Sequence, residues 1–137
     1  MTEDQSTLLI IKPDAVRRGL VGEIVGRVER KGLRIDELRT MRIDAGLAER
    51  HYAEHRDKPF FTELVDFITS GPVVVAKLSG RQAVTVLRTL MGSTDPAASP
   101  PGTIRGDLGL EITNNLVHGS DSPAAAAREL GLFFPGD

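Results

Sequence analysis

The chain has 137 residues, a formal net charge of −2 and no cysteine. This length suits one domain with its own hydrophobic core, which we expect to span residues 1–137. The charge gives no sign of a polyanion-binding surface, and the lack of cysteine excludes disulfides and zinc–thiolate sites. No apolar run approaches the roughly 20 residues that span a bilayer. Since the first residues are acidic and polar, unlike a leader peptide, the sequence predicts a cytoplasmic protein.

Strands and helices alternate along the chain. Strands are predicted where apolar residues run together, and helices where apolar residues recur every three or four positions. A break in the pattern at 36–37 indicates a bulge, and Gly32 is typical of a helix C-cap. We expect strands at 8–11, 33–43, 73–78 and up to His118. We expect helices at 21–31, 45–55, 60–69, 83–91 and 123–130.

This order of elements is typical of an α+β protein with a ferredoxin-like fold. We expect a four-stranded antiparallel sheet with helices packed on one face. The composition changes abruptly at 92–102, where glycine, serine, proline and alanine predominate. Loops of this length inside compact domains are usually functional, so this segment is a candidate part of a binding site.

His118 is the most informative residue of the chain. It follows a buried run at 116–117, and Gly119 permits a sharp turn directly behind it. Side-chain oxygens at 120–122 can cap a helix that begins with Pro123. Side chains at strand ends are often catalytic because a rigid scaffold positions them. His118 is therefore a candidate nucleophile; the alternative is a histidine with a structural role.

The sequence lacks both common glycine-rich phosphate-binding motifs. It contains no P-loop sequence and no Gly-x-Gly-x-x-Gly after the first strand, so side chains would have to hold a nucleotide. Three cations are candidates: Lys12 at the end of the first strand, Arg88 on the polar side of a helix, and Arg105 between two glycines at the end of the loop. The alternative for Lys12 and for Arg88 is an ordinary solvated side chain.

His51 and His55 lie four residues apart on a predicted helix, which raises the question of a metal site. A zinc-protease helix would read His-Glu-x-x-His, whereas Tyr52 follows the first histidine here and Glu54 precedes the second. No third ligand follows at a suitable distance. We therefore expect the two histidines to be surface or packing residues.

Five short motifs stand in an order typical of one family. They are Ile11-Lys12-Pro13-Asp14-Ala15, His51-Tyr52 through Lys58-Pro59-Phe60-Phe61, Ser70-Gly71-Pro72-Val73, Pro101-Gly102-Thr103-Ile104-Arg105-Gly106-Asp107 and Asn115-Leu116-Val117-His118-Gly119-Ser120-Asp121. Together they resemble the nucleoside diphosphate kinase family, in its bacterial type with a short C-terminus. The likeness runs from about Thr7 to Phe134.

The resemblance implies an enzyme that transfers the γ-phosphate of a nucleoside triphosphate, mainly ATP, to a nucleoside diphosphate and so maintains NTP and dNTP pools. The phosphate would pass through a phosphohistidine at His118 in a ping-pong reaction that requires Mg²⁺. Glu129 would orient the imidazole, Ser120 would support it, and Asp121 would reach the metal through water. The phosphates and sugar would contact Lys12, Tyr52, Arg88, Thr94, Arg105 and Asn115.

Phe60 has two interpretations. Its helical spacing with Leu64 indicates a core residue, whereas the resemblance makes it the surface on which the base stacks. Stacking tolerates every base, which would give a broad substrate range. Phe61 is expected in the core, and Glu54 is a further candidate for the active-site network. The resemblance also implies a homo-oligomer, and we expect a hexamer rather than a tetramer, although the tail that many relatives use in subunit contacts is missing.

Two other classes of protein could use the same fold. A regulatory module could bind a nucleotide without turning it over, but it would give no reason for His118 and Glu129 to match the family together. A single-stranded nucleic-acid binder would carry aromatic residues on its central strands, and 8–11 and 73–78 have none. The sequence therefore favours the enzyme, with nucleotides as ligands and neither nucleic acid nor membrane as a partner.

Overall fold

The computed structural model describes residues 4–112 and 114–136, which contain a four-stranded antiparallel sheet. The strands are β1 (Asp4–Ile11), β2 (Arg34–Met41), β3 (Val73–Arg81) and β4 (Val117–Gly119), in the spatial order β2-β3-β1-β4. The α-helices are α1 (Pro13–Arg17), α2 (Val21–Lys31), α3 (Ala45–His51), α4 (Phe61–Ile68), α5 (Ala83–Met91), α6 (Ile104–Leu108) and α7 (Pro123–Phe133). The strand order is that of the ferredoxin-like fold, which confirms the predicted α+β class.

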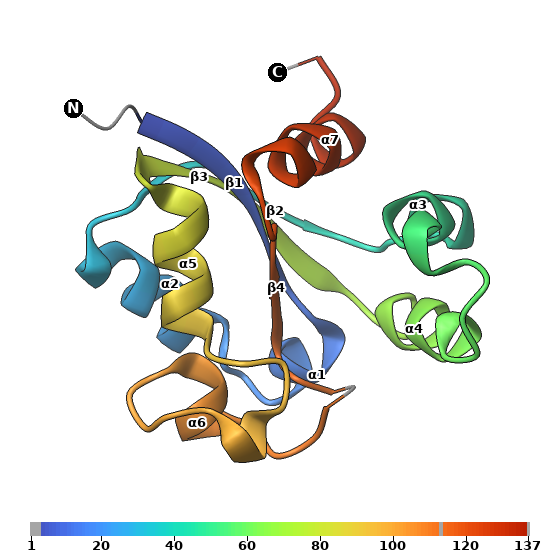
Figure 1. Ribbon diagram of the computed structural model, residues 1–137, viewed down its shortest axis with the longest axis horizontal. Coiled ribbons are helices and arrows are strands. Elements are labelled where there is room, and N and C mark those ends of the chain that lie inside the picture. Colours follow the sequence, from blue (N-terminus) through green and yellow to red (C-terminus); the bar gives the residue numbers. More distant parts are fainter. Residues whose placement is uncertain (1–3, 113, 137) are drawn as a thin grey trace.

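Helices cover both faces of the sheet, and the expectation of one covered face was wrong (Figure 1). Leu9 and Ile11 of β1 pack with α2 and α5, whereas Leu8 and Ile10 pack with α3, α4 and α7. All four side chains are at most 1% exposed. A strand buried on both faces needs an uninterrupted apolar run, and the run at 8–11 is therefore the signal for the second layer of helices.

The predicted bulge and helix cap are present, whereas some helix boundaries differ from the prediction. The register of β2 shifts between Ile35 and Glu37, as the predicted bulge requires, and Gly32 caps α2 with a φ of 107°. The helix expected at 45–55 is divided, because α3 ends at His51 and a short 3₁₀ helix, η1 (Ala53–His55), follows. The segment 92–102 contains a second one, η2 (Pro96–Ala98). Arg105 lies within α6, a helix that the sequence analysis did not predict.

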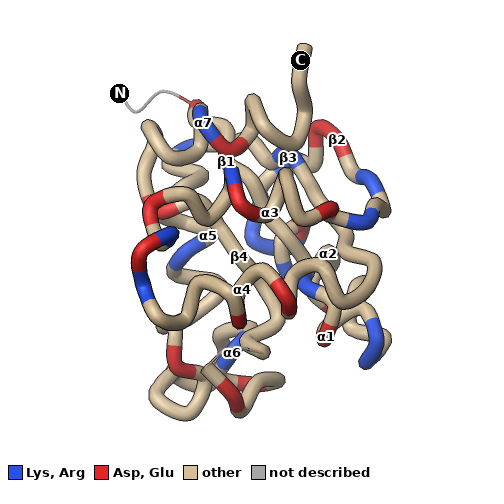
Figure 2. The backbone as a smooth tube through the Cα atoms, turned by 90° about the vertical axis from the view of Figure 1, so that its right-hand side faces the viewer, with Lys and Arg blue, Asp and Glu red and all other residues tan. Residues whose placement is uncertain are grey.

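Charged residues of both signs are interspersed along the chain (Figure 2). Arg27 of α2, for example, lies 2.7 Å from Glu23 in its own helix and 2.8 Å from Asp107 of α6, so this ion-pair network joins two elements. None of the helices in the described parts of the chain has the length and apolar character needed to cross a membrane.

Candidate active site

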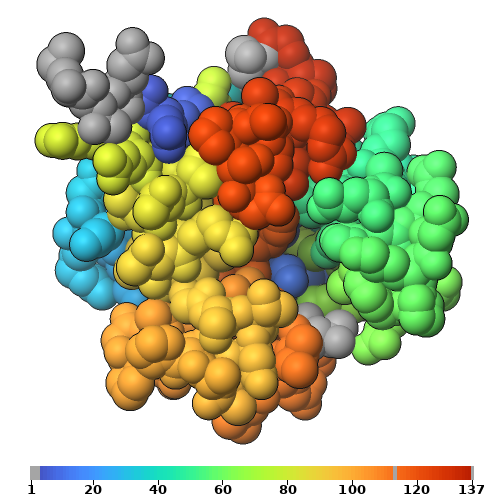
Figure 3. Space-filling model, viewed as in Figure 1, coloured from blue at the N-terminus to red at the C-terminus, as the bar shows by residue number. Residues whose placement is uncertain are grey.

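A cavity of about 580 Å³ lies beside β4. Figure 3 shows it as a hollow between the C-terminal segment, the α3–α4 segment and the segment around α6, with part of the N-terminal segment visible at its floor. The predicted site residues in its wall are Lys12, Tyr52, Glu54, Phe60, Arg88, Thr94, Asn115, His118, Asp121 and Glu129. Ser120 and Arg105 lie behind the wall, and their contacts are described below. Residues that the sequence analysis did not assign to the site also line it, among them His51, Glu63 and Ile112.

Strand β4 positions His118 in the sheet, opposite Ile10 of β1. Gly119 was expected to allow a sharp turn, but it ends the strand and its φ is not positive. The reason for glycine is space, because a Cβ atom there would lie 2.9 Å from Leu87 Cδ2 and 2.9 Å from Met91 Sδ. The absent side chain therefore lets α5 pack closely against the strand that carries the histidine.

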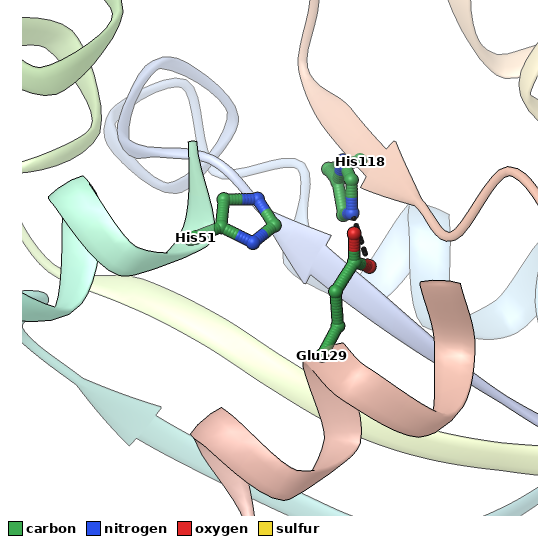
Figure 4. A group of neighbouring side chains, drawn as sticks. All are labelled: His51, His118 and Glu129. Atoms are coloured by element: carbon green, nitrogen blue, oxygen red, sulfur yellow. Dashed lines mark hydrogen bonds and ion pairs between the residues drawn. The ribbon is translucent and has the colours of Figure 1, made fainter. Parts of the chain in front are cut away.

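A hydrogen bond fixes the orientation of the His118 ring. Nε2 of His118 lies 2.9 Å from Oε1 of Glu129 (Figure 4). The Ser120 hydroxyl donates to the same oxygen at 2.7 Å. Burial alone would raise the pKa of Glu129, but the hydrogen bonds from His118 and Ser120 and the charge of His118 outweigh it and bring the pKa to about 2. Because an ionised carboxylate only accepts, Nε2 donates its proton to Glu129, and in the neutral ring the lone pair is therefore on Nδ1.

Lys12 lies at the junction of β1 and α1, where its side chain lines the cavity. Its backbone N–H donates to the Leu116 carbonyl at 2.8 Å, and its ammonium donates to Asn115 Oδ1, also at 2.8 Å. Burial, and secondly the charge of Arg105, lower the pKa of Lys12 from 10.5 to about 8. The site therefore holds a desolvated cation that a phosphate would stabilise strongly.

The backbone before β4 is strained. Leu116 is fully buried and has a φ of 77°, in the left-handed region that residues other than glycine rarely adopt. Its N–H donates to Oδ2 of Asp14 at 3.1 Å, and Asp14 is itself 7% exposed. In the sequence Asp14 stands out only as part of the first of the five family-like motifs. Its role as an acceptor that helps to hold the segment before His118 depends on a contact between distant parts of the chain.

Arg105 fastens the long loop to the last strand. Its guanidinium donates to the carbonyls of Asn115 at 3.1 Å and Val117 at 2.6 Å, and to those of Gly92 at 3.1 Å and Ser93 at 3.3 Å. These bonds use four of the five N–H groups of an arginine. Burial, and secondly the charge of Arg88, lower the pKa of Arg105 to about 10.

The aromatic residues of the cavity occupy two environments. Tyr52 is 8% exposed, and burial, with the charge of Glu129, raises the pKa of its phenol to about 12, so the hydroxyl stays a donor at neutral pH. Phe60 is 42% exposed and precedes α4, which supports the surface interpretation over the core one. Phe61 packs partly buried against the core, as expected.

His51 is a buried neighbour of the candidate nucleophile. Its ring lies 4.7 Å from that of His118, in an edge-to-face arrangement with an interplanar angle of 83°. Burial, and secondly the charge of His118, lower the pKa of His51 to about 3, so the ring is neutral. Arg128 of α7 donates to the His51 carbonyl at 3.2 Å and thereby fastens the end of α3. His51 therefore packs in the site, whereas His55 is more exposed and belongs to η1.

A histidine held by a carboxylate, beside buried cations and an open aromatic ring, is the arrangement of a phosphotransferase with a histidine nucleophile. The comparisons with known proteins agree. The sequence model of the family described as nucleoside diphosphate kinase matches residues 5–137. The chain belongs to the nucleoside diphosphate kinase family.

Individual relatives are similar over almost the whole chain. The nucleoside diphosphate kinase of Rubrobacter xylanophilus is 62% identical over 132 residues, which are 96% of this chain and 99% of the relative. That of Archaeoglobus fulgidus is 56% identical, over 97% of this chain and 88% of the relative. The structure of the Halobacterium salinarum nucleoside diphosphate kinase in complex with CDP superposes with a TM-score of 0.96 at 52% identity, and the match covers 98% of this chain and 90% of that one.

Proposed function

We propose that this member of the family catalyses γ-phosphate transfer between nucleotides by a ping-pong mechanism through His118. The observation that carries the proposal is the 2.9 Å hydrogen bond between His118 Nε2 and Glu129, in the wall of a cavity that also contains Lys12 and Arg88. In the neutral ring this contact leaves the lone pair on Nδ1. A module that only binds a nucleotide would need the cations but would not need an oriented imidazole.

The reaction has two symmetrical halves. Nδ1 of His118 attacks the γ-phosphorus of a nucleoside triphosphate, the P–N bond forms as the bond to the β-phosphate oxygen breaks, and the diphosphate leaves. The ring gains positive charge, which the Glu129 carboxylate stabilises through Nε2–H. A second nucleoside diphosphate then takes the phosphoryl group back through its terminal oxygen. One set of cations serves both transition states.

Different residues of the cavity wall would have different roles in binding the nucleotide. Lys12, Arg88 and Thr94 would contact phosphate oxygens, and the buried Asn115 amide supports the site by accepting from Lys12 and donating to the Thr94 carbonyl at 3.1 Å. Arg105 would act by fixing the loop and by adding positive potential. The Tyr52 phenol would donate a hydrogen bond to the nucleotide.

Base recognition would fall to exposed apolar side chains. Phe60 is 42% exposed and Ile112 is 59% exposed, and both line the cavity. An aromatic face stacks on any base and reads no hydrogen-bonding edge, so we expect a broad substrate range.

The described residues fit a nucleotide-bound Mg²⁺. This ion usually keeps several waters and binds one or two carboxylates together with substrate phosphates, and Asp121 and Glu54 place carboxylates in the cavity wall. When bound, Mg²⁺ would neutralise phosphate charge. Asp121 would hold it through water. The side chains described above would bind the nucleotide and carry out the phosphate transfer.

We further propose that the chain works as a homo-oligomer in the cytoplasm. Strand β2 is an edge strand whose Leu38 is 48% exposed, and such edges invite association. A hexamer rather than a tetramer stays a prediction for analytical ultracentrifugation. The cytoplasmic setting rests on the absence of cysteine.

Initial-rate kinetics with ATP and a second nucleoside diphosphate test the mechanism. Parallel double-reciprocal lines at several fixed diphosphate concentrations are expected, because the two nucleotides never occupy the site together. Intersecting lines would require a complex of enzyme with both nucleotides and would refute the ping-pong mechanism. Tight nucleotide binding without turnover would favour a regulatory module.

A further inference from the structure

Three potential metal ligands from three different elements converge beside the nucleophile. His51 comes from the end of α3, His118 from β4 and Glu129 from α7 (Figure 4). One donor atom from each residue lies within 4.8 Å of the other two. The sequence did not predict a metal site at His51 and His55, and no linear spacing reveals the group that His51 forms with His118 and Glu129.

The phosphate-transfer reaction leaves His51 without a function. The residue is 4% exposed, and neither ring nitrogen has a hydrogen-bond partner among the described residues. Buried polar groups are nearly always paired, because an unpaired one is destabilising. The ring faces the His118–Glu129 pair (Figure 4), so its unpartnered nitrogens are close to two further donors.

We propose that His51, His118 and Glu129 form a binding site for Zn²⁺ or a similar transition-metal cation, which inhibits the enzyme when it binds. Two imidazoles and a carboxylate are an established donor set for Zn²⁺ and leave a fourth position for water. Mg²⁺ prefers oxygen ligands, so the ion that accompanies the nucleotide would not compete for these nitrogens.

The distances are compatible with such a site. Zn–N and Zn–O bonds of about 2.0–2.2 Å place tetrahedral donors about 3.4 Å apart. His118 Nε2 and Glu129 Oε1, at 2.9 Å, need only a small separation. His51 must approach by roughly 1–2 Å with a turn of its ring to bring a nitrogen to the metal. Because one donor atom from each residue already lies within 4.8 Å of the other two, no larger movement is needed.

Inhibition follows from the tautomer of His118. A neutral imidazole has one N–H and one lone pair. In the metal-free protein Nε2 donates to Glu129, and Nδ1 holds the lone pair that attacks phosphorus. A cation on Nε2 uses the lone pair there, the proton moves through solvent to Nδ1, and the nucleophile is lost without any redox change. This inhibitory consequence rests on the proposed function, whereas metal binding itself does not.

Cobalt spectroscopy on the nucleotide-free protein tests the site directly. Co²⁺ in a four- or five-coordinate protein site absorbs visible light far more strongly than the hydrated ion. The chain has three histidines and no cysteine, so few other donors could produce this signal. We expect one Co²⁺ per chain, displaced by Zn²⁺. ¹⁵N NMR should show the His118 proton moving from Nε2 to Nδ1 when Zn²⁺ binds.

His51→Asn removes one ligand, and His55→Asn is the matched control in the same cavity. His51→Asn should weaken Co²⁺ binding by more than about 10–100-fold, the loss typical of changes to residues that only support ligands. His55→Asn should leave binding unchanged. Zn²⁺ inhibition, measured against each variant's own metal-free rate, should follow the same order. Wild-type Co²⁺ affinity in His51→Asn, or its loss in His55→Asn, would overturn the proposal.

A second variant protects the test against misfolding. If His51→Asn does not fold, Glu129→Gln removes the carboxylate ligand at nearly constant volume, and undiminished Co²⁺ binding by this variant would also overturn the site. The proposed metal site and the proposed kinase mechanism can be refuted independently of each other. Co²⁺ binding by a wild-type protein without kinase activity would leave the metal site standing alone. An active enzyme without the Co²⁺ signal would leave the kinase mechanism intact and refute the site.

Discussion

Nucleoside diphosphate affinity should fall as the pH rises above about 8, because Lys12 loses its charge there. The Lys12 side chain is buried, and burial, with the Arg105 charge, lowers its pKa from 10.5 to about 8. Only the ammonium pairs with phosphate, so binding above this pH must first place a proton on Lys12. The affinity should therefore fall by about ten-fold per pH unit, or about 1.4 kcal/mol.

A loss of nucleotide affinity that begins near pH 8 is what a lysine with its pKa lowered to about 8 predicts. Below pH 8 Lys12 already carries its proton and the affinity should be flat, since nucleotide phosphates with a second pKa of about 6 stay ionised. Stability should change in the opposite direction. The unfolded chain keeps the lysine proton up to the ordinary pKa of 10.5, so the Lys12 contribution to the free energy of unfolding rises with pH between about 8 and 10.5.

Isothermal titration calorimetry with ADP, from about pH 7 to 9.5 in buffers of different ionisation enthalpy, measures both the affinity and the proton taken up. Lys12→Arg is the control, because a guanidinium keeps its charge over this range. Wild-type affinity that is constant across the range would refute the reasoning. So would a parallel decline in Lys12→Arg.

Three further substitutions test other parts of the site. Glu129→Gln should lower kcat by about 10²–10⁴-fold, because His118 loses the charge that holds its tautomer; unchanged steady-state kcat would contradict this. Gly119→Ala should cost about 1–3 kcal/mol in urea unfolding, since its Cβ would lie 2.9 Å from α5 atoms, whereas Gly131→Ala, with no atom within 4 Å, should not destabilise. Phe60→Ala should weaken ADP, GDP and CDP equally, by about 1–3 kcal/mol in calorimetry; a loss confined to one base would exclude simple stacking.

The fold class could be predicted because its strands are short apolar runs between clear helix signals. The apolar runs at 8–11 and 73–78 lie within β1 and β3, and Gly32 is the C-cap of α2, as expected. The second covered face was missed although the uninterrupted apolar run at 8–11 indicates burial on both faces, because such a run has no period that shows which helices pack on which face. Helix α6 was missed because its five residues are too few for a periodic pattern, and Thr103 caps it from within a loop-like composition.

The contact between His118 and Glu129 was expected from the resemblance to the family, and the structure shows the two side chains hydrogen-bonded. His118 and Glu129 are 11 residues apart, on a strand and the helix that directly follows it. The supporting contacts could not be predicted in this way. Asp14 and Leu116 are 102 residues apart, and their hydrogen bond exists only because β1 and β4 are neighbours. The position of His51 beside His118 likewise depends on how α3 packs against α7.

The most direct test of the mechanism is to identify which nitrogen of His118 becomes phosphorylated. Wild type and His118→Ala are incubated with γ-labelled ATP and Mg²⁺, and the phosphohistidine isomer is identified by ³¹P NMR before a chase with GDP. Because Nε2 is held by Glu129, we predict acid-labile, alkali-stable label on Nδ1 of His118 in the wild type alone, discharged to GTP by the chase. Label on Nε2, or equal label on His118→Ala, would contradict the account.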